Sequence, residues 1–254
     1  MGKAQVLDSK GRRLSPCPLD RARRLVAEGR ATVVSEGPLT IQLAREVKLP
    51  SQEKPADTPA SGEGKRILLH VCCGPCSTYT VDRLREEGFE VTALWYNPNI
   101  QPYSEHQRRL ASMESYAQSV GLPLLREGSY EMVQFLRMVA GREGHGVRCS
   151  FCYRMRLGRT AEVAATKGFD AFTTTLLISP HQDQALIRQI GESVAGEEGV
   201  DFHFENFRRG WSERGRMTRE HDLYRQQYCG CVYSEWERYA GVQIEQEGPE
   251  KDDG

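Results

Sequence analysis

The 254-residue sequence lacks any hydrophobic run long enough to cross a membrane. Its longest uncharged apolar stretches, such as residues 171–180, fall far short of the roughly 20 residues that a transmembrane helix needs. The first residues, Met1-Gly-Lys, lead into no hydrophobic segment of the kind that a secretory signal contains. The sequence therefore predicts a cytoplasmic protein without a membrane partner.

The chain also lacks an excess of charge of either sign, since its net charge at pH 7 is −1. That balance argues against a general binder of polyanions. The charge is unevenly distributed, however: residues 1–48 hold ten Lys and Arg against five Asp and Glu. Any contact with nucleic acid is therefore expected to come from local basic patches.

Residues 49–64 contain three prolines, two glycines and no apolar periodicity, which is typical of a flexible linker. The linker divides the chain into a small basic α+β module, residues 1–48, and a main domain, residues 65–240. An acidic tail, residues 241–254, follows. In the module we expect strands at 5–7, 31–34 and 39–43, and a helix that Asp20 caps.

The main domain alternates short apolar runs with helical stretches. We expect strands at 66–71, 90–96, 123–126, 171–177 and 201–204, and helices at 77–87, 105–120, 131–139, 153–167 and 182–195. This alternation predicts the α/β class, with a mostly parallel sheet and helices on both faces. Ligands of such sheets bind at the loops that leave the carboxyl ends of the strands. Cys72, Cys73, Cys76 and residues 179–183 fall in such loops.

Seven of the eight cysteines form three tight groups: Cys72, Cys73 and Cys76; Cys149 and Cys152; Cys229 and Cys231. A disulfide framework is not expected in a reducing cytosol. Two cysteines separated by two residues on a turn can place both sulfurs on one metal or cluster. Seven thiols are too many for one centre, whether zinc or a [4Fe–4S] cluster. Cys17 stands apart between two prolines and is expected to be a single packed or exposed thiol.

Two familiar motifs are missing. A radical-SAM enzyme would need a third cysteine three residues after Cys76, and Tyr79 occupies that position. The segment 72–76 also lacks the Gly/Ser run that cradles phosphate in nucleotide-activating enzymes, which counts against a thiol or sulfur transferase.

Other residues give weaker signals. Six arginines between 208 and 225 alternate with aromatic residues, a pattern that suits either RNA with splayed bases or a solvated helix face. Arg148 precedes Cys149 and could hold its thiolate ionised or bind phosphate. Of the histidines, His181 lies in a loop at the end of a predicted strand and is the best candidate for a site residue. His70 lies within a predicted strand and is expected in the core.

Five segments, LLHVCCGPC, WYNPNIQP, RCSFCYRMRL, TTTLLISPHQD and YRQQYCGCVYS, occur in this order between residue 67 and about residue 236. Together they resemble the QueH family of epoxyqueuosine reductases. The resemblance implies a Rossmann-like fold and reduction of the epoxide of epoxyqueuosine, at the wobble position in the anticodon loop of tRNA, to give queuosine. It implies a [4Fe–4S] cluster with an adjacent iron, an external electron donor and no cobalamin.

By this resemblance Cys72, Cys73, Cys149 and Cys152 are the cluster ligands. Cys229 and Cys231 are either ligands of the second iron or a redox-active dithiol, and Cys76 is a further candidate ligand. The candidates for proton donation are His181, Asp183 and Tyr228. The candidates for substrate contact are Tyr96, Asn97, Arg148 and Arg225.

The small module resembles the RRXRR or PLMP module found at the start of certain RNA-guided nucleases, although no nuclease motif follows it. We expect it either to grip tRNA through its positive charge or to have a structural docking role. The alternative for the whole chain is a zinc-bearing RNA-binding protein without catalysis.

Overall fold

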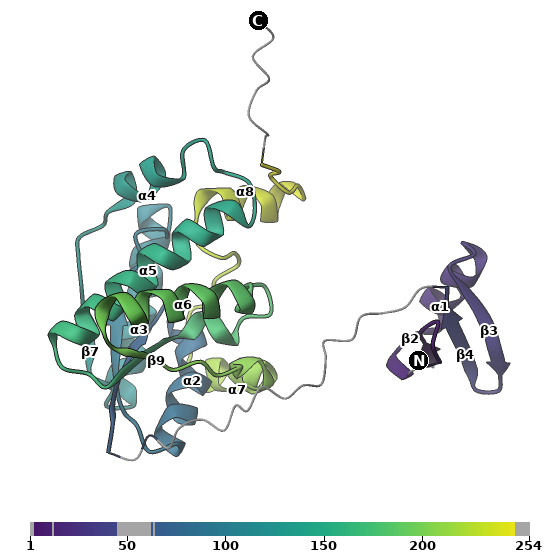
Figure 1. Cartoon of the computed structure of the whole chain (residues 1–254), viewed down its shortest axis with the longest axis horizontal. Helices are drawn as coiled ribbons and strands as arrows, with labels where there is room; N and C mark the ends of the chain where they lie inside the picture. The colour runs from purple at the N-terminus through teal and green to yellow at the C-terminus, as the bar shows by residue number, and fades with distance from the viewer. Residues whose placement is uncertain (1–2, 12, 45–61, 63, 247–254) are drawn as a thin grey trace, which may run out of the picture. The chain divides into compact units, whose positions relative to one another are not determined.

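The computed structural model describes residues 3–11, 13–44, 62 and 64–246, and the chain forms two compact units, residues 1–57 and 58–254 (Figure 1). Most of the predicted linker 49–64, and the acidic tail beyond residue 246, lie outside the described residues. Within the described part, no helix is both long and apolar enough to span a bilayer.

The smaller unit is a four-stranded sheet with one helix. Its elements are β1 (Lys3–Leu7), β2 (Arg13–Pro18), α1 (Leu19–Ala27), β3 (Ala31–Glu36) and β4 (Leu39–Leu43). The strands lie in the order β2-β1-β4-β3, and β1 pairs in parallel with β4. Cys17 is buried with Val6 and Ile41 in the core of this unit, so it is a packed single thiol. Strand β2 was not expected because Pro16 and Pro18 interrupt it; as an edge strand it tolerates them.

The larger unit is built on a five-stranded sheet in which every neighbouring pair of strands is parallel. Its strands are β5 (Arg66–His70), β6 (Glu90–Trp95), β7 (Leu124–Arg126), β8 (Ala171–Thr174) and β9 (Asp201–Phe202), in the order β7-β6-β5-β8-β9. All five predicted strands are confirmed. The chain reverses direction across the sheet between β5 and β8, and the carboxyl ends of strands at such a switch point border a ligand-binding crevice.

Helices cover both faces of this sheet, as the sequence predicts. They are α2 (Gly74–Glu86), α3 (Tyr103–Ser119), α4 (Met132–Val139), α5 (Val147–Thr166), α6 (Gln184–Glu198), α7 (Trp211–Glu220) and α8 (Val232–Ala240). Helix α2 packs against α3 and α7, whereas α5 packs against α6 and against strands β5 and β8 (Figure 1). Because crossovers between parallel strands are almost always right-handed, connections that run in opposite directions along the sheet are expected on opposite faces. Both groups seal an apolar core that includes the fully buried Ile67, Leu69 and Phe172.

Three local expectations were wrong. Helix α5 begins at Val147 rather than near residue 153, so Cys149 and Cys152 lie within a helix and not on a turn. Strand β8 ends at Thr174, whose hydroxyl accepts a hydrogen bond from the Leu176 backbone and starts a 3₁₀ helix, Thr175–Ile178. Helices α7 and α8 were not expected: α7 is strongly polar, and α8 is only nine residues long.

The packing of α6 on β9 gives a matched pair of stability predictions. A Cβ atom on Gly191 would lie 2.3 Å from Cε1 of Phe202, whereas one on Gly196, in the same helix, would meet nothing within 4 Å. We expect Gly191→Ala to lower the free energy of unfolding by about 1–3 kcal/mol through overpacking. Gly196→Ala should raise it by up to about 1 kcal/mol through helix propensity.

Urea unfolding followed by tryptophan fluorescence measures both effects. All three tryptophans, Trp95, Trp211 and Trp236, belong to the larger unit, so the signal reports that unit alone. Equal midpoints for the two variants would contradict the packing described here.

Candidate metal centre

The loop after β5 and the first turn of α2 carry three buried cysteines whose sulfur atoms face one another. The Sγ atoms of Cys72, Cys73 and Cys76 all lie within 4.8 Å of one another. Those of Cys72 and Cys73 are 3.9 Å apart. Cys73 also caps helix α2, because its Sγ accepts a hydrogen bond from the Cys76 backbone N–H at 3.4 Å. The cap fixes the sulfurs in a group that is compact enough for one metal ion.

The pKa values of the Cys73 and Cys76 thiols are shifted in opposite directions. Hydrogen bonds from the Cys72 and Cys73 thiols, together with the nearby Arg214 guanidinium, hold the pKa of Cys76 well below the usual range. Arg214 Nη1 lies 3.9 Å and Gln226 Nε2 3.6 Å from the Cys76 sulfur. Burial raises the pKa of Cys73 well above its usual value. Without metal, the group therefore carries its negative charge at Cys76.

The other four clustered cysteines line a second space. Cys149 and Cys152 lie three residues apart on α5, so both face the same side of the helix. They line a cavity of about 260 Å³ together with Cys229 and Cys231, which precede α8. Burial raises the pKa of Cys149, and that of Cys152 to about 12. A metal that binds these thiols as thiolates must displace their protons.

The two groups of cysteines border connected parts of one region. A larger cavity of about 840 Å³ is lined by Cys72, Cys76 and Cys229, and Cys229 also lines the smaller one. His181 and Gln182 likewise line both cavities. Cysteines from three distant segments thus meet near the carboxyl ends of β5 and β8, where the sequence predicted a site.

A buried arginine holds the Cys229–Cys231 loop in place. Arg109 is 1% exposed, and its guanidinium donates hydrogen bonds to the carbonyl oxygens of Cys229 (2.8 Å) and Tyr228 (3.0 Å). It also forms an ion pair with Glu105 at 2.7 Å. Between the two cysteines, Gly230 has a φ of +154°, and its Cβ position would lie 3.1 Å from the side chain of Asn99. This close approach favours glycine at the centre of the loop.

A second buried arginine lies among the thiols themselves. Arg156 is 1% exposed and interacts electrostatically with Cys152, Cys229 and Cys72. Its Nε donates to the Cys152 carbonyl at 3.2 Å, but its Nη2 is buried without a hydrogen-bond partner among the described residues. A guanidinium with one unpaired nitrogen lies beside several thiols. Such an arrangement suits a site that becomes more negative when its thiols lose their protons to bind metal. The donor set and this orphaned nitrogen therefore fit an iron–sulfur centre.

Five of the residues predicted to donate protons or contact substrate border the cysteine cavities, and Arg148 is one of them. His181 lines both cavities, Asp183 the smaller one, and Tyr228 and Arg225 the larger one. Asp183 and Tyr228 already have other partners: the Asp183 carboxylate caps α6 by accepting from the Leu186 N–H at 3.1 Å. The Tyr228 hydroxyl donates to the Gln101 carbonyl at 2.6 Å.

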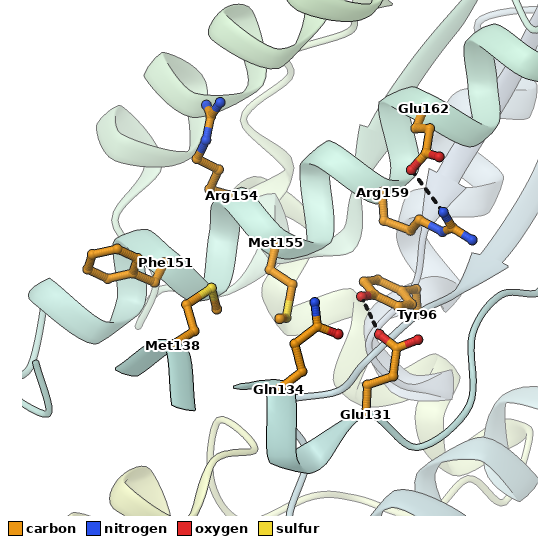
Figure 2. A pocket seen from close by; sticks show the side chains of 9 residues that line it. All are labelled: Tyr96, Glu131, Gln134, Met138, Phe151, Arg154, Met155, Arg159 and Glu162. Carbon is orange, nitrogen blue, oxygen red and sulfur yellow. Dashed lines mark hydrogen bonds and ion pairs between the residues drawn. The ribbon is translucent and has the colours of Figure 1, made fainter. Parts of the chain in front are cut away.

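The other predicted substrate residues, Arg148 included, lie elsewhere or are already paired. Tyr96 lines a separate cavity of about 520 Å³ bordered by α4 and α5, and its hydroxyl donates to Glu131 at 2.8 Å (Figure 2). Asn97 is 2% exposed and donates to the Val71 carbonyl at 2.8 Å. Arg148 lines the smaller cysteine cavity but forms an ion pair with Glu237 of α8. Their contact with substrate stays a prediction.

Several side chains that touch the sulfurs were missed by the sequence reading. Gln182 donates to Cys229 Sγ at 3.5 Å, and the Thr175 hydroxyl donates to Cys72 Sγ at 3.4 Å. Gln182 lies between His181 and Asp183, so position in the motif could have indicated it. Arg214 was visible only as one of six arginines, and Thr175 and Gln226 only as members of the matched segments.

The unequal charge of the Cys72, Cys73 and Cys76 group can be tested by alkylation. In metal-free protein at pH 7 we expect iodoacetamide to label Cys76 at least about tenfold faster than Cys73, since each unit of pKa changes the thiolate population about tenfold. Arg214→Met should slow labelling of Cys76. Arg225→Met, which alters another arginine of the same cavity, should not. Peptide mass spectrometry measures the rates, and equal rates for Cys76 and Cys73 would disprove the assignment.

Comparison with known proteins agrees with the motifs. The family described as "Epoxyqueuosine reductase QueH" matches residues 67–237, and the RRXRR family matches residues 4–61. The epoxyqueuosine reductase QueH of Dehalococcoides mccartyi is 43% identical over 174 residues, which cover 68% of this chain and 94% of that protein. The Thermotoga maritima QueH is 37% identical over 180 residues, which cover 68% of this chain and 91% of that protein. The chain therefore belongs to the QueH family.

Proposed function

We propose that this protein reduces the epoxide of epoxyqueuosine in the anticodon loop of tRNA to the alkene of queuosine. The reaction takes two electrons and two protons, and the epoxide oxygen leaves as water. The observation that carries the proposal is that cysteines from three segments of a QueH-family chain line two cavities, which share Cys229, His181 and Gln182. Membership of the family supports the choice of substrate.

The cavity has the features that a modified nucleoside requires. Its volume of about 840 Å³ lies within the range of ligand pockets, about 300–1,000 Å³. Trp211 and Tyr228 offer aromatic surfaces for a base, and Arg214, Arg225 and Arg238 offer positive charge for phosphate. A nucleotide in an anticodon loop is already partly unstacked, so turning it into the cavity costs little.

We propose that Cys72, Cys73, Cys149 and Cys152 hold a [4Fe–4S] cluster and that Cys76, Cys229 and Cys231 hold a second iron. Such a cluster, when bound, supplies electrons one at a time from an external donor. Arg156 supports this assignment, because it interacts with Cys72 and with Cys152. Its positive charge would offset part of the thiolate charge. Arg109 keeps Cys229 at the boundary of both cavities by binding its carbonyl.

Among the three candidates for proton donation, we propose His181. Its side chain borders both cavities, and histidine is the side chain that most often transfers protons in enzymes. Asp183 is used as the cap of α6, and the Tyr228 hydroxyl proton points to a backbone carbonyl. Both would have to give up a hydrogen bond to serve the substrate.

Two cysteine variants test the ligand assignment. Cys149→Ala should lose both the broad visible absorption of the reconstituted cluster and the conversion of epoxyqueuosine to queuosine in tRNA, measured by nucleoside mass spectrometry. Cys229→Ala should keep the absorption and lose the conversion. Cys17→Ala, in the core of the smaller unit, is the control and should keep both.

Loss of the cluster absorption in Cys229→Ala would change the ligand assignment. If Cys229→Ala also lost the absorption, the cluster would belong to the four cysteines that line the smaller cavity, and the assignment of Cys72 and Cys73 would be wrong. If Cys149→Ala kept both absorption and conversion, neither assignment would stand.

We also propose that the small N-terminal unit grips tRNA. Residues 1–48 carry five more positive than negative side chains, and residues 4–61 match the RRXRR family. Removal of residues 1–57 should raise the Kd for tRNA several-fold at low salt and make log Kd less dependent on log salt, because fewer phosphates are neutralised. Filter binding at several salt concentrations measures both. Unchanged affinity and slope would leave the unit a structural role only.

A further inference from the structure

A second group of possible metal ligands lies far from the cysteines. Glu87 directly follows helix α2, whose first turn carries Cys76, and thirteen helical residues span about 20 Å. His203 and Glu205 follow strand β9, which pairs with the beginning of β8. Glu87 therefore lies about one helix length from Cys76, at the opposite end of α2.

The three side chains converge on one buried point. Exposure of the side chains is 8% for Glu87, 8% for His203 and 7% for Glu205. His203 Nε2 lies 3.5 Å from Glu87 Oε2 and 4.0 Å from Glu205 Oε2. These separations exceed the 2.7–3.2 Å of ordinary N–H···O hydrogen bonds. They are close to the roughly 3.4 Å between two ligands bound at about 2.1 Å in a tetrahedral zinc site.

All three converging atoms lack a hydrogen-bond partner among the residues that the structure describes. Glu87 Oε2, His203 Nε2 and Glu205 Oε2 are each buried, and the polar neighbours that we find for them in the described part of the chain are one another, at ion-pair rather than hydrogen-bond distance. Buried polar atoms in folded proteins are rarely left this way, and three that face one another indicate a shared occupant.

The opposite side of each carboxylate is already held by arginine. Arg83 binds Oε1 of both Glu87 and Glu205, the latter at 2.9 Å, and Arg209 also binds Glu205 Oε1. The Phe89 ring packs edge-on against the His203 imidazole, with the centroids 5.0 Å apart. These contacts turn the free oxygens and Nε2 toward one another, as outer contacts do in metal sites.

We propose that Glu87, His203 and Glu205 bind a structural divalent transition metal, for which Zn²⁺ is the first choice. An imidazole with two carboxylates, in a buried setting, favours zinc over magnesium or calcium, which prefer sites made only of oxygen. The ion would tie the end of α2 to the segment after β9, and it is separate from the redox centre.

The competing occupant is a proton. Burial and the neighbouring Glu205 raise the pKa of Glu87 to about 7, so a proton on Glu87 would also relieve the group. A proton leaves no zinc in the protein, and the two occupants are therefore separable by experiment.

Zinc binding to the full-length, iron-loaded protein tests the proposal. Iron loading first fills the thiols, which also bind zinc. After equilibrium dialysis against micromolar ZnCl₂, we expect about one zinc per chain, with nitrogen and oxygen but no sulfur neighbours in the zinc X-ray absorption spectrum. Glu205→Gln and His203→Phe should each weaken zinc binding at least tenfold without changing the iron content. Glu192→Gln, an exposed glutamate paired with Arg188, should bind zinc as the wild type does.

The wild-type protein alone can overturn the proposal, so the test does not depend on the variants folding. Iron-loaded wild type that takes up no zinc, or whose zinc has sulfur neighbours, would show that the group does not bind metal. Zinc binding that survives both ligand substitutions would also contradict it.

Discussion

The structure of the larger unit depends on holding several cysteines close together in a largely apolar setting. Thiolates repel one another, and burial raises the pKa of Cys149 and Cys152, so the arrangement is unfavourable without compensation. Arg156 and Arg214 supply positive charge beside the sulfurs, and Arg109 fixes the loop that carries Cys229 and Cys231. Two cavities lie between these residues, and a cofactor and a substrate can occupy them.

The doubly wound sheet explains why distant segments can meet there. Cys72 follows β5 and Thr175 follows β8, and these neighbouring strands run in parallel, so both loops leave the same edge. The start of α5 and the loop before α8 complete the site from outside the sheet. Each group of cysteines thus has its own support: a helix cap at Cys73, a helix face at Cys149 and Cys152, and a second helix cap at Cys231.

The parts of the fold that follow from hydrophobic periodicity were predictable from the sequence. The five strands and the order of helices between them were found because apolar runs such as 67–69 are unambiguous. Helices α7 and α8 were not, since α7 buries only Arg214, Met217 and Thr218 and α8 buries no residue. Some residues of the candidate site were likewise predictable from the sequence, and others were not. The clustered cysteines were evident, whereas Gln182, Thr175 and Gln226 lie in the matched segments but reach sulfur only through tertiary contacts. The group of Glu87, His203 and Glu205 has no sequence signal, because more than a hundred residues separate Glu87 from the other two.

The central claim is that the clustered cysteines hold iron and that the protein uses it on tRNA. The most direct measurement is the content of iron, acid-labile sulfide and zinc in protein purified without oxygen, taken together with conversion of epoxyqueuosine in tRNA. We expect at least about four irons and four sulfides per chain, as a [4Fe–4S] cluster requires, and conversion that depends on them. Cysteines occupied by zinc alone, with no sulfide and no conversion, would contradict the account and leave an RNA-binding protein without catalysis.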